Sequence, residues 1–355
     1  MINLSQFDYK LNPDLIANQP VSTRDHSQLM FINRKGGQIS HHRFYNLPQL
    51  LNSNFILVLN QTKVFPARIF AQKKSGGHVE ILLTSQLNSN TWETISKPRL
   101  KLNQTINFAS NLFAQVIFED KQQGYSHLQF SLSDQHLIKA IHQIGLTPIP
   151  PYIKSTYHEK KLRQQYQTVY AHIPGSCAAP TAGLHFTRRL LNKLEEQGIA
   201  IKFITLHVGP GTFQNLRPEN LKTKSLHTEN YQIDKKTATF LNQAKADAKK
   251  IIAVGTTTAR TLESSLSQDY QLVAQKSSTN LFIFPPYRFK FIDGLITNFH
   301  LPQSSLLMLV SAFSSSPQTH SEFKTFKSSL IGKAYQQAIK NHYRFYSFGD
   351  AMLIL

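Results

Sequence analysis

Short segments of alternating polar and apolar residues, separated by turn residues, occupy the chain between positions 65 and 132. Turn sequences such as Ser75-Gly76-Gly77 separate them. Period-two alternation is typical of half-buried strands, and it occurs in six segments, at 67–72, 78–84, 91–96, 105–109, 113–119 and 126–132. Six such strands predict a small closed or nearly closed β-barrel. A short helix over 134–144 and a proline-rich linker over 148–151 should follow it.

After residue 152 the pattern changes to apolar strands that alternate with amphipathic helices. Helices are expected over 187–198, 236–249, 256–266 and 304–313, and a last one carries the spaced apolar residues from Phe326 to Ile339. Strands are expected over 200–208, 251–255 and 294–300, and over 55–59 ahead of the barrel. This alternation predicts an α/β layer domain with an inserted small β-barrel domain. We expect the α/β domain to span residues 1–62 and 150–355, and the barrel domain residues 63–149.

Composition adds a large positive charge to this picture. The 355 residues include 39 Lys and Arg against 20 Asp and Glu, which leaves a net charge of +19. Such an excess favours a polyanionic partner, nucleic acid first and a membrane surface as the alternative, although solubility alone would also explain it. Aromatic residues at 11% argue for a folded chain.

The cysteine count and the length of the apolar runs indicate in which cellular compartment the protein is expected. The single cysteine, Cys177, excludes an internal disulfide framework and a cysteine-rich zinc site. The apolar runs, such as 55–59 and 306–310, are far shorter than the roughly 18 residues that a membrane span needs. The first ten residues do not resemble a signal peptide. We therefore expect a soluble, cytoplasmic protein that does not bind membranes.

The common cofactor and nucleophile motifs are missing from the sequence. Gly209-Pro210-Gly211 lacks the third glycine of the dinucleotide fingerprint, and there is no P-loop, G-x-S-x-G or H-E-x-x-H. The 15 histidines include no pair at i, i+4 beside a carboxylate on an evident helix. We therefore expect no metal.

Four segments are richer in small and polar residues than packing requires, namely 175–186, 205–213, 255–263 and 297–302. Three of them lie at the ends of predicted strands, and ligands of open α/β sheets collect beyond the carboxyl ends of strands. Structural explanations stay open, because a threonine run can cap a helix and a strand-end histidine can be a hydrogen-bonded core residue. Cys177 fits a small buried filler. The residues alone indicate a small-molecule site on a basic α/β protein.

These segments resemble the S-adenosylmethionine:tRNA ribosyltransferase-isomerase family of queuosine biosynthesis, nearly from end to end. The resemblance rests on long ordered motifs, which include Phe7-Asp-Tyr, Asn60-x-Thr-x-Val-x-Pro-Ala-Arg68, the 175–187 segment, the 205–214 segment, His227-x-Glu-x-Tyr231, Gly255-Thr-Thr, Arg260-Thr-Leu-Glu-Ser264, the 295–302 segment and the 343–352 segment. The chain departs from the family's usual Asp, Arg, Val, Ala and Gly at Gln61, Lys63, Cys177, Pro210 and Pro286. Gln61 removes a carboxylate and is therefore given no catalytic role.

The resemblance implies an α/β domain with an inserted β-barrel and a reaction in which S-adenosylmethionine is a consumed ribosyl donor. The implied acceptor is 7-aminomethyl-7-deazaguanine at the wobble position of a tRNA, and the products are epoxyqueuosine-tRNA, adenine and methionine. No cofactor is expected. The implied partners are this tRNA and S-adenosylmethionine, and we expect a monomer.

Site residues follow from the matching motifs. Histidine titrates in the range that the proton transfers need, so the acid–base candidates are His185, His207 and His300. The expected S-adenosylmethionine-binding residues are Thr181, Gly183, Thr256, Thr257, Arg260, Glu229 and Glu263. Arg260 suits the methionine carboxylate. The expected deazaguanine- and tRNA-binding residues are Arg344, Asp350, Lys97, Arg99 and Lys101, with further phosphate contacts at Lys324, Lys327, Lys333 and Lys340.

Two other functions stay open. A tRNA methyltransferase would use the same donor, but the chain has no glycine-rich donor loop after a first strand. A non-catalytic RNA-binding protein would explain the charge and the barrel, but not four ligand-like loops at strand ends. The residues also leave open which histidine is the general base and which tRNAs are substrates.

Overall fold

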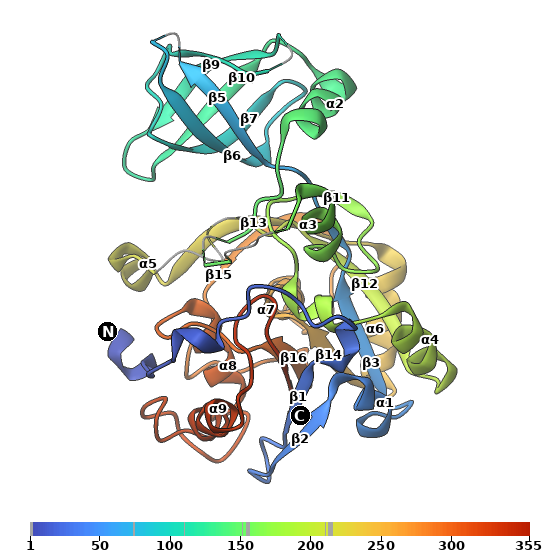
Figure 1. Ribbon diagram of the computed structural model, residues 1–355. Helices are drawn as coiled ribbons and strands as arrows, with labels where there is room; N and C mark the ends of the chain where they lie inside the picture. The colour runs from blue at the N-terminus through green and yellow to red at the C-terminus, as the bar shows by residue number, and fades with distance from the viewer. Residues whose placement is uncertain are drawn as a thin grey trace.

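A nine-stranded mixed sheet forms the centre of the larger part of the molecule, and a β-barrel lies above it (Figure 1). The computed structural model describes residues 3–73, 75–109, 111–150, 152–153, 157–209, 211 and 216–355. In spatial order the strands of the sheet are β15 (Gln275–Leu281), β13 (Ser225–Ile233), β12 (Ala200–Leu206), β3 (Phe55–Asn60), β14 (Lys250–Val254), β16 (Gly294–Asn298), β17 (Ala351–Ile354), β1 (Gln28–Ile32) and β2 (Ile39–Arg43).

The four central strands β12, β3, β14 and β16 run parallel to one another. These are the strands that the sequence predicts, although β12 ends at Leu206 and β16 at Asn298, two residues earlier than expected in each case. The outer strands β13, β15, β17, β1 and β2 were not predicted. β17 and β13 are antiparallel to their central neighbours, so the sheet is mixed, and the predicted α/β layer architecture is confirmed.

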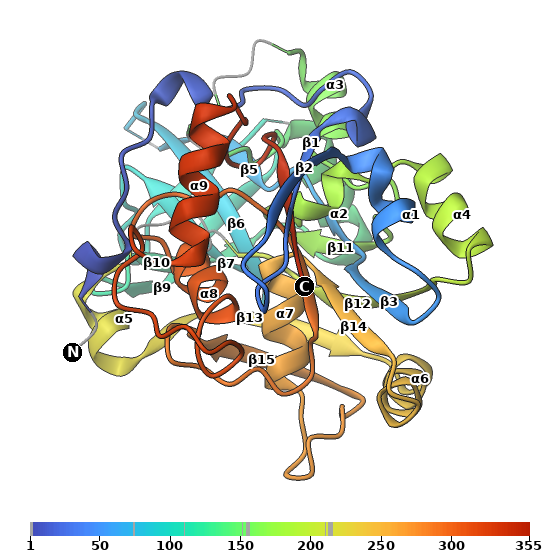
Figure 2. The ribbon, with the colours of Figure 1, turned by 90° about the horizontal axis from the view of Figure 1, so that it is seen from below.

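Alternate side chains of the central strands face two helical layers. On β3, Ile56 and Val58 pack into one core with α6 (Lys235–Ala246), α7 (Thr256–Ser264), α8 (Ser305–Phe313) and α9 (Leu330–Lys340). Leu57 and Leu59 pack into the other core with α1 (Leu47–Leu50) and α4 (Arg188–Glu196). Figure 2 shows α7, α8 and α9 on one side of the sheet and α1 and α4 on the other. A strand covered on both faces must be apolar throughout, which explains the run 55–59.

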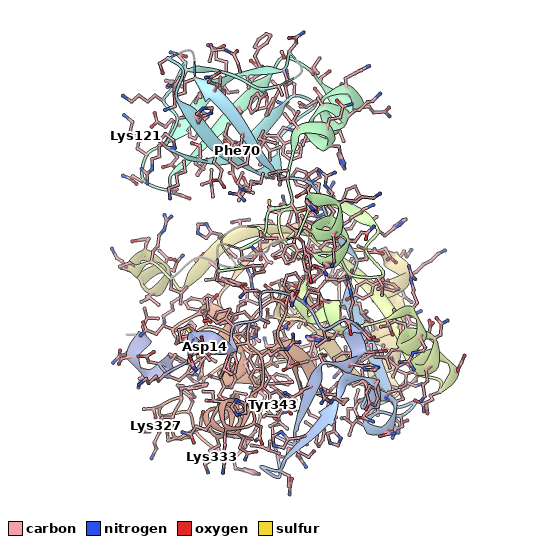
Figure 3. All side chains as sticks on the ribbon, in the orientation of Figure 1. Asp14, Phe70, Lys121, Lys327, Lys333 and Tyr343 are labelled. Carbon is pink, nitrogen blue, oxygen red and sulfur yellow. The ribbon has the colours of Figure 1, made fainter. Side chains whose placement is uncertain are left out.

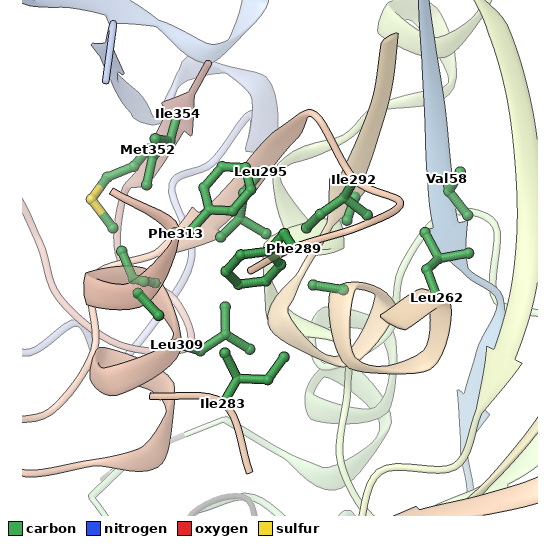
Figure 4. Close-up of a cluster of buried hydrophobic side chains, with 14 of the residues drawn as sticks. Val58, Leu262, Ile283, Phe289, Ile292, Leu295, Leu309, Phe313, Met352 and Ile354 are labelled. Carbon is green, nitrogen blue, oxygen red and sulfur yellow. The ribbon is translucent and has the colours of Figure 1, made fainter. Parts of the chain in front are cut away.

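Aromatic side chains fill the core between the sheet and α8. Phe289 and Phe313 meet edge to face with ring centroids 4.9 Å apart, and they are packed with Leu295, Leu309 and Ile283 (Figure 4). Glu263 holds the loop that carries Phe289, because its carboxylate accepts hydrogen bonds from the backbone of residues 290–292. The end of α7 and the loop 287–292 are therefore tied to the same core.

The six predicted barrel strands close on one another in the order β10 (Tyr125–Phe130), β7 (Thr91–Lys97), β6 (His78–Gln86), β5 (Arg68–Lys73), β8 (Thr105–Asn107) and β9 (Phe113–Asp120). Helix α2 (Asp134–Ile144) packs on the barrel core and stops before Gly145, as predicted. Outside the barrel, β4 (Thr62–Val64) pairs with β11 (Ile173–Ser176). The remaining helices are α3 (Glu159–Gln165) and α5 (Pro218–Thr223).

Cys177 lies where the two parts of the molecule meet. It is buried in the barrel core cluster, and its thiol donates to the Leu83 carbonyl at 2.9 Å. Burial raises the pKa of the thiol to about 12, so the sulfur is protonated and unreactive. The prediction of a small buried filler is confirmed.

The helices within the described parts of the chain are all too short or too polar to cross a membrane.

Candidate active site

The carboxyl ends of the four parallel strands meet at the edge of the sheet that faces the barrel side of the molecule (Figure 1). The 205–213 segment begins in β12 and continues beyond it, the 255–263 segment follows β14, and the 297–302 segment continues β16. The short helix η5 (Thr181–His185) lies against β16 at the same edge. The fold therefore brings the four polar segments together; positions 210 and 212–213 of the second lie outside the described residues.

A small pocket of about 30 Å³ opens at this edge. It is lined by Ala179, Pro180, Thr181, Ala182, Val208, Gly255, Thr256, Thr257, Thr297, Asn298, His300 and Leu306. Four of the sequence-predicted site residues are in this set, namely Thr181, Thr256, Thr257 and His300. Residues from all four polar segments, with Leu306, thus converge on one concave surface, as small-molecule sites in open α/β sheets do.

The start of α7 leaves one hydroxyl group in this pocket without a partner. Gly255 precedes the helix at φ 93° and gives it no side-chain cap. Thr258 donates its hydroxyl to the Val254 carbonyl at 2.7 Å, whereas the buried Thr257 Oγ1 makes no hydrogen bond within the described structure. An unpaired buried hydroxyl costs about 1–3 kcal/mol, so it points to a bound group that would accept or donate there. The threonine run is therefore more than a helix cap.

Asn298 connects three segments at the end of β16. Its Oδ1 accepts from the Thr181 hydroxyl at 3.2 Å, and its Nδ2 donates to the Tyr346 carbonyl at 3.1 Å. These two contacts fix which end of the amide is which. The same Nδ2 lies 3.1 Å from His185 Nε2, so that ring nitrogen must accept. Sequence analysis did not select Asn298; a polar residue that ends an apolar strand was the available signal.

His185 is buried with both ring nitrogens hydrogen-bonded. Nε2 accepts from Asn298, so Nδ1 carries the proton and donates to Ser27 Oγ at 2.8 Å. Burial, with Arg344 and Arg24 nearby, lowers the pKa of His185 to about 3. Its ring also stacks on Phe44, with centroids 5.1 Å apart. The arrangement suits a neutral imidazole that orients Asn298.

His300 lines the pocket and is also neutral. Its Nε2 lies 2.8 Å from Thr297 Oγ1, and its backbone N–H donates to the Tyr335 hydroxyl at 2.9 Å. Burial lowers the pKa of His300 to about 3. Its Nδ1 has no hydrogen-bond partner among the described residues, so this nitrogen can act on a molecule in the pocket.

His207 follows β12 and lies outside this pocket. Its Nδ1 is 2.8 Å from Thr62 Oγ1, and its ring packs on Gly175, whose φ is 139° and where a Cβ atom would come within 2.8 Å of His207 Cε1. Burial first and Lys276 second lower the pKa of His207. Within the described structure Nε2 is unbonded. A neutral imidazole with one nitrogen oriented and the other free is the arrangement of a general base.

Arg260 and Glu229 form a buried ion pair beside the strand ends. Arg260 Nη1 lies 2.5 Å from Glu229 Oε2, and their side chains are 5% and 3% exposed. Glu229 also accepts from the Gly209 N–H, and Arg260 Nε donates to the Leu281 carbonyl. Arg260 Nη2 is buried and unpaired with respect to the described residues. The N–H groups of Arg260 Nη2 can therefore donate hydrogen bonds to an anionic group of a ligand.

Three predicted site residues have other contacts. Glu263 accepts four hydrogen bonds from the 287–292 loop, and burial raises its pKa. A Cβ atom at Gly183 would overlap the Tyr170 hydroxyl, so the glycine permits this close packing. Asp350 accepts from the backbone N–H groups of Gln28 and Arg344, at 2.9 and 2.8 Å. The structure does not bring these three residues into the pocket.

The predicted barrel cations lie apart from the pocket. Lys97, Arg99 and Lys101 are exposed, and Arg99 lines a second hollow of about 210 Å³ between the barrel and the α/β part, opposite Arg217. Arg344 lies near Asp350, with Nη2 3.4 Å from Asp350 Oδ1. Within the described ranges, the structure has no cluster of three or more His, Cys, Asp or Glu that could hold a metal ion.

Comparison with known proteins places this α/β fold with its inserted barrel in one family. The family model of the queuosine biosynthesis protein matches residues 4–354. The S-adenosylmethionine:tRNA ribosyltransferase-isomerases of Desulforamulus reducens and Halothermothrix orenii are 43% and 44% identical to the chain, over all of both sequences in each case. A crystal structure of the S-adenosylmethionine tRNA ribosyltransferase from Thermotoga maritima is 34% identical, with a TM-score of 0.55, and the match covers 99% of this chain and all of that one.

The chain belongs to the S-adenosylmethionine:tRNA ribosyltransferase-isomerase family of queuosine biosynthesis. It is an enzyme of this family, and the resemblance carried by its motifs is confirmed.

Proposed function

We propose that the chain transfers the ribosyl moiety of S-adenosylmethionine to 7-aminomethyl-7-deazaguanine at the wobble position of a tRNA and isomerises it. The products would be epoxyqueuosine-tRNA, adenine and methionine. The observation that carries this proposal is identity of 43–44% over the full length of enzymes named for it. The pocket at the strand ends supports it, because unpaired buried groups converge there and beside it.

The reaction needs three proton-handling functions. A base removes a proton from the ribose carbon next to the sulfonium, whose positive charge makes that proton acidic. Adenine leaves more readily when the purine accepts a proton or a hydrogen bond, and the acceptor amine must be neutral to attack. His207 and His300 are neutral and each retains an unbonded ring nitrogen within the described structure. They are the proposed acid–base pair, and His185 is proposed to orient the site through Asn298.

The donor is proposed to bind along the start of α7. Thr257 Oγ1 and Thr181 Oγ1 offer hydroxyl contacts in the pocket, and the Thr256 and Thr257 N–H groups lie at the uncapped helix start. Arg260 Nη2 is the proposed partner of the methionine carboxylate, with Glu229 near the amine. The pocket at the strand ends is small and does not include Arg260, so part of the donor is proposed to lie outside it, toward Arg260 and Glu229.

The tRNA is proposed to bind from the barrel side. Lys97, Arg99 and Lys101 would contact phosphates, and Arg344 would lie near the modified base. Asp350 can read the base only if it exchanges one of its backbone partners. We expect the protein to act in the cytoplasm as a monomer, without a cofactor, since S-adenosylmethionine is consumed.

The decisive experiment is chromatography of the small products after mixing the protein, S-adenosylmethionine and tRNA that carries 7-aminomethyl-7-deazaguanine. We expect adenine and methionine, and only with the modified tRNA. S-adenosylhomocysteine would show a methyltransferase instead. If a folded sample forms no product although tRNA still binds, the chain is a non-catalytic RNA-binding protein.

A further inference from the structure

The hollow between the barrel and the α/β part is built from two facing sets of polar side chains. The barrel contributes Thr84, Glu93, Ile95, Ser96, Arg99, Gln123, Gly124 and Tyr125, and the α/β part contributes Gly211, Arg217 and His227. Its volume of about 210 Å³ is several times that of the pocket at the strand ends. Figure 1 shows this side of the molecule, with α5 below the barrel on one flank and α4 on the other.

Two arginines are held at the same turn of the barrel. Arg99 donates to the Lys121 carbonyl at 3.0 Å, and Arg217, at the start of α5, donates to the Gln123 carbonyl at 3.4 Å. The ion pairs of the described residues include neither guanidinium, and each retains further N–H donors beside its bond to a carbonyl. Lys121 lies on the same edge of the barrel (Figure 3). These cations are oriented by neutral carbonyls and remain free to neutralise an anion.

A row of aromatic rings leads away from the hollow across the outside of the barrel. Tyr125 is nearly parallel to His127, with centroids 5.7 Å apart, and His127 lies 4.6 Å from Phe118. His127 and Phe118 are directly opposite each other on β10 and β9. Phe118 is 41% exposed. Such rings on an outer barrel face are the stacking surfaces on which proteins bind unpaired bases.

The hollow also has a hydrogen-bond acceptor and a short path to the candidate active site. Glu93 accepts from Thr84 through Oε1, and its second oxygen can accept from the amino group of a base. His227 and Glu229 both lie on β13, and the same loop contacts both of them. The Gly209 N–H donates to Glu229, and Gly211 lies so close to the His227 ring that a Cβ atom there would overlap it. Glu229 pairs with Arg260 in the candidate site. A nucleotide in the hollow would therefore neighbour the reacting one.

We infer that this hollow and the aromatic row bind unpaired nucleotides of the RNA substrate. A phosphate lies between Arg99 and Arg217, and a base stacks on Tyr125, while further bases follow His127 and Phe118. The inference rests on the proposed function, because it places these nucleotides beside the one that is modified. Cations beside exposed rings suit single-stranded RNA, whose phosphates and unpaired bases can use both. A double-stranded helix can bind the cations through its phosphates, but its bases are already stacked and cannot use the rings.

Binding of a fluorescently labelled anticodon stem–loop RNA, measured by anisotropy over a range of salt concentrations, tests this site without turnover. Arg217→Ala should weaken binding about five- to tenfold and reduce the slope of log affinity against log salt by about 0.7. Tyr125→Leu should weaken binding by about 5- to 150-fold with an unchanged slope, and Tyr125→Phe should bind as the unsubstituted protein does. Arg188→Ala, on exposed α4, is the matched charge control.

A fully paired RNA duplex without a loop completes the experiment. Tyr125→Leu should not change its affinity, and thermal unfolding should show that each variant is folded. Unchanged binding of the stem–loop by Arg217→Ala and Tyr125→Leu would overturn the inference, as would an equal loss for both RNAs with Tyr125→Leu. If the variants lose stem–loop binding but the unsubstituted protein forms neither adenine nor methionine, this RNA site stands and the proposed function fails.

Discussion

The three candidate histidines differ in whether a ring nitrogen is left without a hydrogen bond in the described structure. Of the three, His207 has the role that is easiest to test. Its Nδ1 contacts Thr62, and its pKa is lowered by burial and by Lys276. A base must be neutral, so activity is lost only as the pH falls through this lowered pKa. We expect the acid limb of kcat/KM to lie below the ordinary imidazole value of about 6.5, as a pH–rate profile would show. His207→Ala should fold and lose turnover; near-normal rates would remove His207 from the mechanism.

His300 ties the stability of the fold to pH. Its pKa is about 3 in the folded protein and about 6.5 when unfolded, so between these values the unfolded chain binds one more proton. Stability should therefore fall as the pH drops below 6.5, by up to about 1.4 kcal/mol per pH unit for this group. Urea unfolding at several pH values measures this. His300→Gln should make the free energy of unfolding less dependent on pH. His136→Gln, which changes an exposed residue of α2, should leave this pH dependence unchanged. Equal slopes for both variants would contradict the assignment.

Gly183 is explained by packing against Tyr170. An added Cβ atom would overlap the Tyr170 hydroxyl and lie 2.9 Å from Thr168 Cγ2, so Gly183→Ala should destabilise the protein by about 1–3 kcal/mol. Gly77→Ala, where a Cβ atom meets nothing closer than 4.0 Å, is the control. Chemical denaturation compares the free energy of unfolding of the two variants with that of the unsubstituted protein. A Gly183→Ala protein of normal stability with weakened donor binding would instead place the glycine against the ligand.

At this scale the sequence predicted the reactive residue types but not their partners. Thr257 and His300 could be selected because they stand in polar segments at predicted strand ends, and Thr181 because it stands in a polar segment just before a predicted helix. Ser27 and Thr62 could not, because their roles arise from contacts such as Ser27 with His185, which are 158 residues apart in the chain. Asn298 was missed although it is a polar residue at the end of an apolar strand. Glu263 and Asp350 were selected for their charge, whereas the structure uses both to bind backbone N–H groups.

At the scale of secondary-structure elements, two neighbouring threonines at the start of α7 allow a matched pair of substitutions that separates ligand binding from stability. Thr257→Val removes a buried hydroxyl that is unpaired in the described structure, so stability should stay unchanged or rise. Its affinity for S-adenosylmethionine, measured by calorimetry, should fall about five- to tenfold, as expected for the loss of one hydrogen bond. Thr258→Val removes a bond to Val254 and should cost about 1 kcal/mol of stability without changing donor affinity. If Thr257→Val binds S-adenosylmethionine normally and Thr258→Val binds it more weakly, Thr257 has no role in binding the ligand.

Some of the elements that the sequence missed lack an apolar pattern, whereas β1 and β17 were missed although they are short apolar strands. β3, β14 and β16 are central, so their residues must be apolar on both faces and the runs are obvious. β15 (Gln275–Leu281) buries only Thr279 and is held by its register with β13. Such an edge strand is specified by its neighbour rather than by its own composition. The barrel was predictable because closure gives every strand one inner face.

At the scale of the whole molecule, two of the regions that carry exposed cations lie at opposite ends (Figure 3). Lys121 lies on the barrel, whereas Lys327 and Lys333 lie at the far end of the α/β part (Figure 3). A net charge of +19 is consistent with either region or both binding phosphates. A whole tRNA presents more phosphates over a greater length than a stem–loop does, so RNAs of the two sizes can separate the contributions of the two regions.

We expect the affinity for whole tRNA to fall steeply with salt, because each phosphate contact releases counterions and adds about 0.7–0.9 to the slope of log affinity against log salt. The slope should be steeper for whole tRNA than for the stem–loop if the lysines near α9 contact the tRNA body. Replacing Lys327 and Lys333 together by Ala should then reduce the slope for whole tRNA by about 1.5 and leave the stem–loop slope unchanged. Filter binding over about 50–200 mM salt measures both. Equal slopes for the two RNAs would confine binding to the barrel side, and a flat dependence would contradict phosphate recognition altogether.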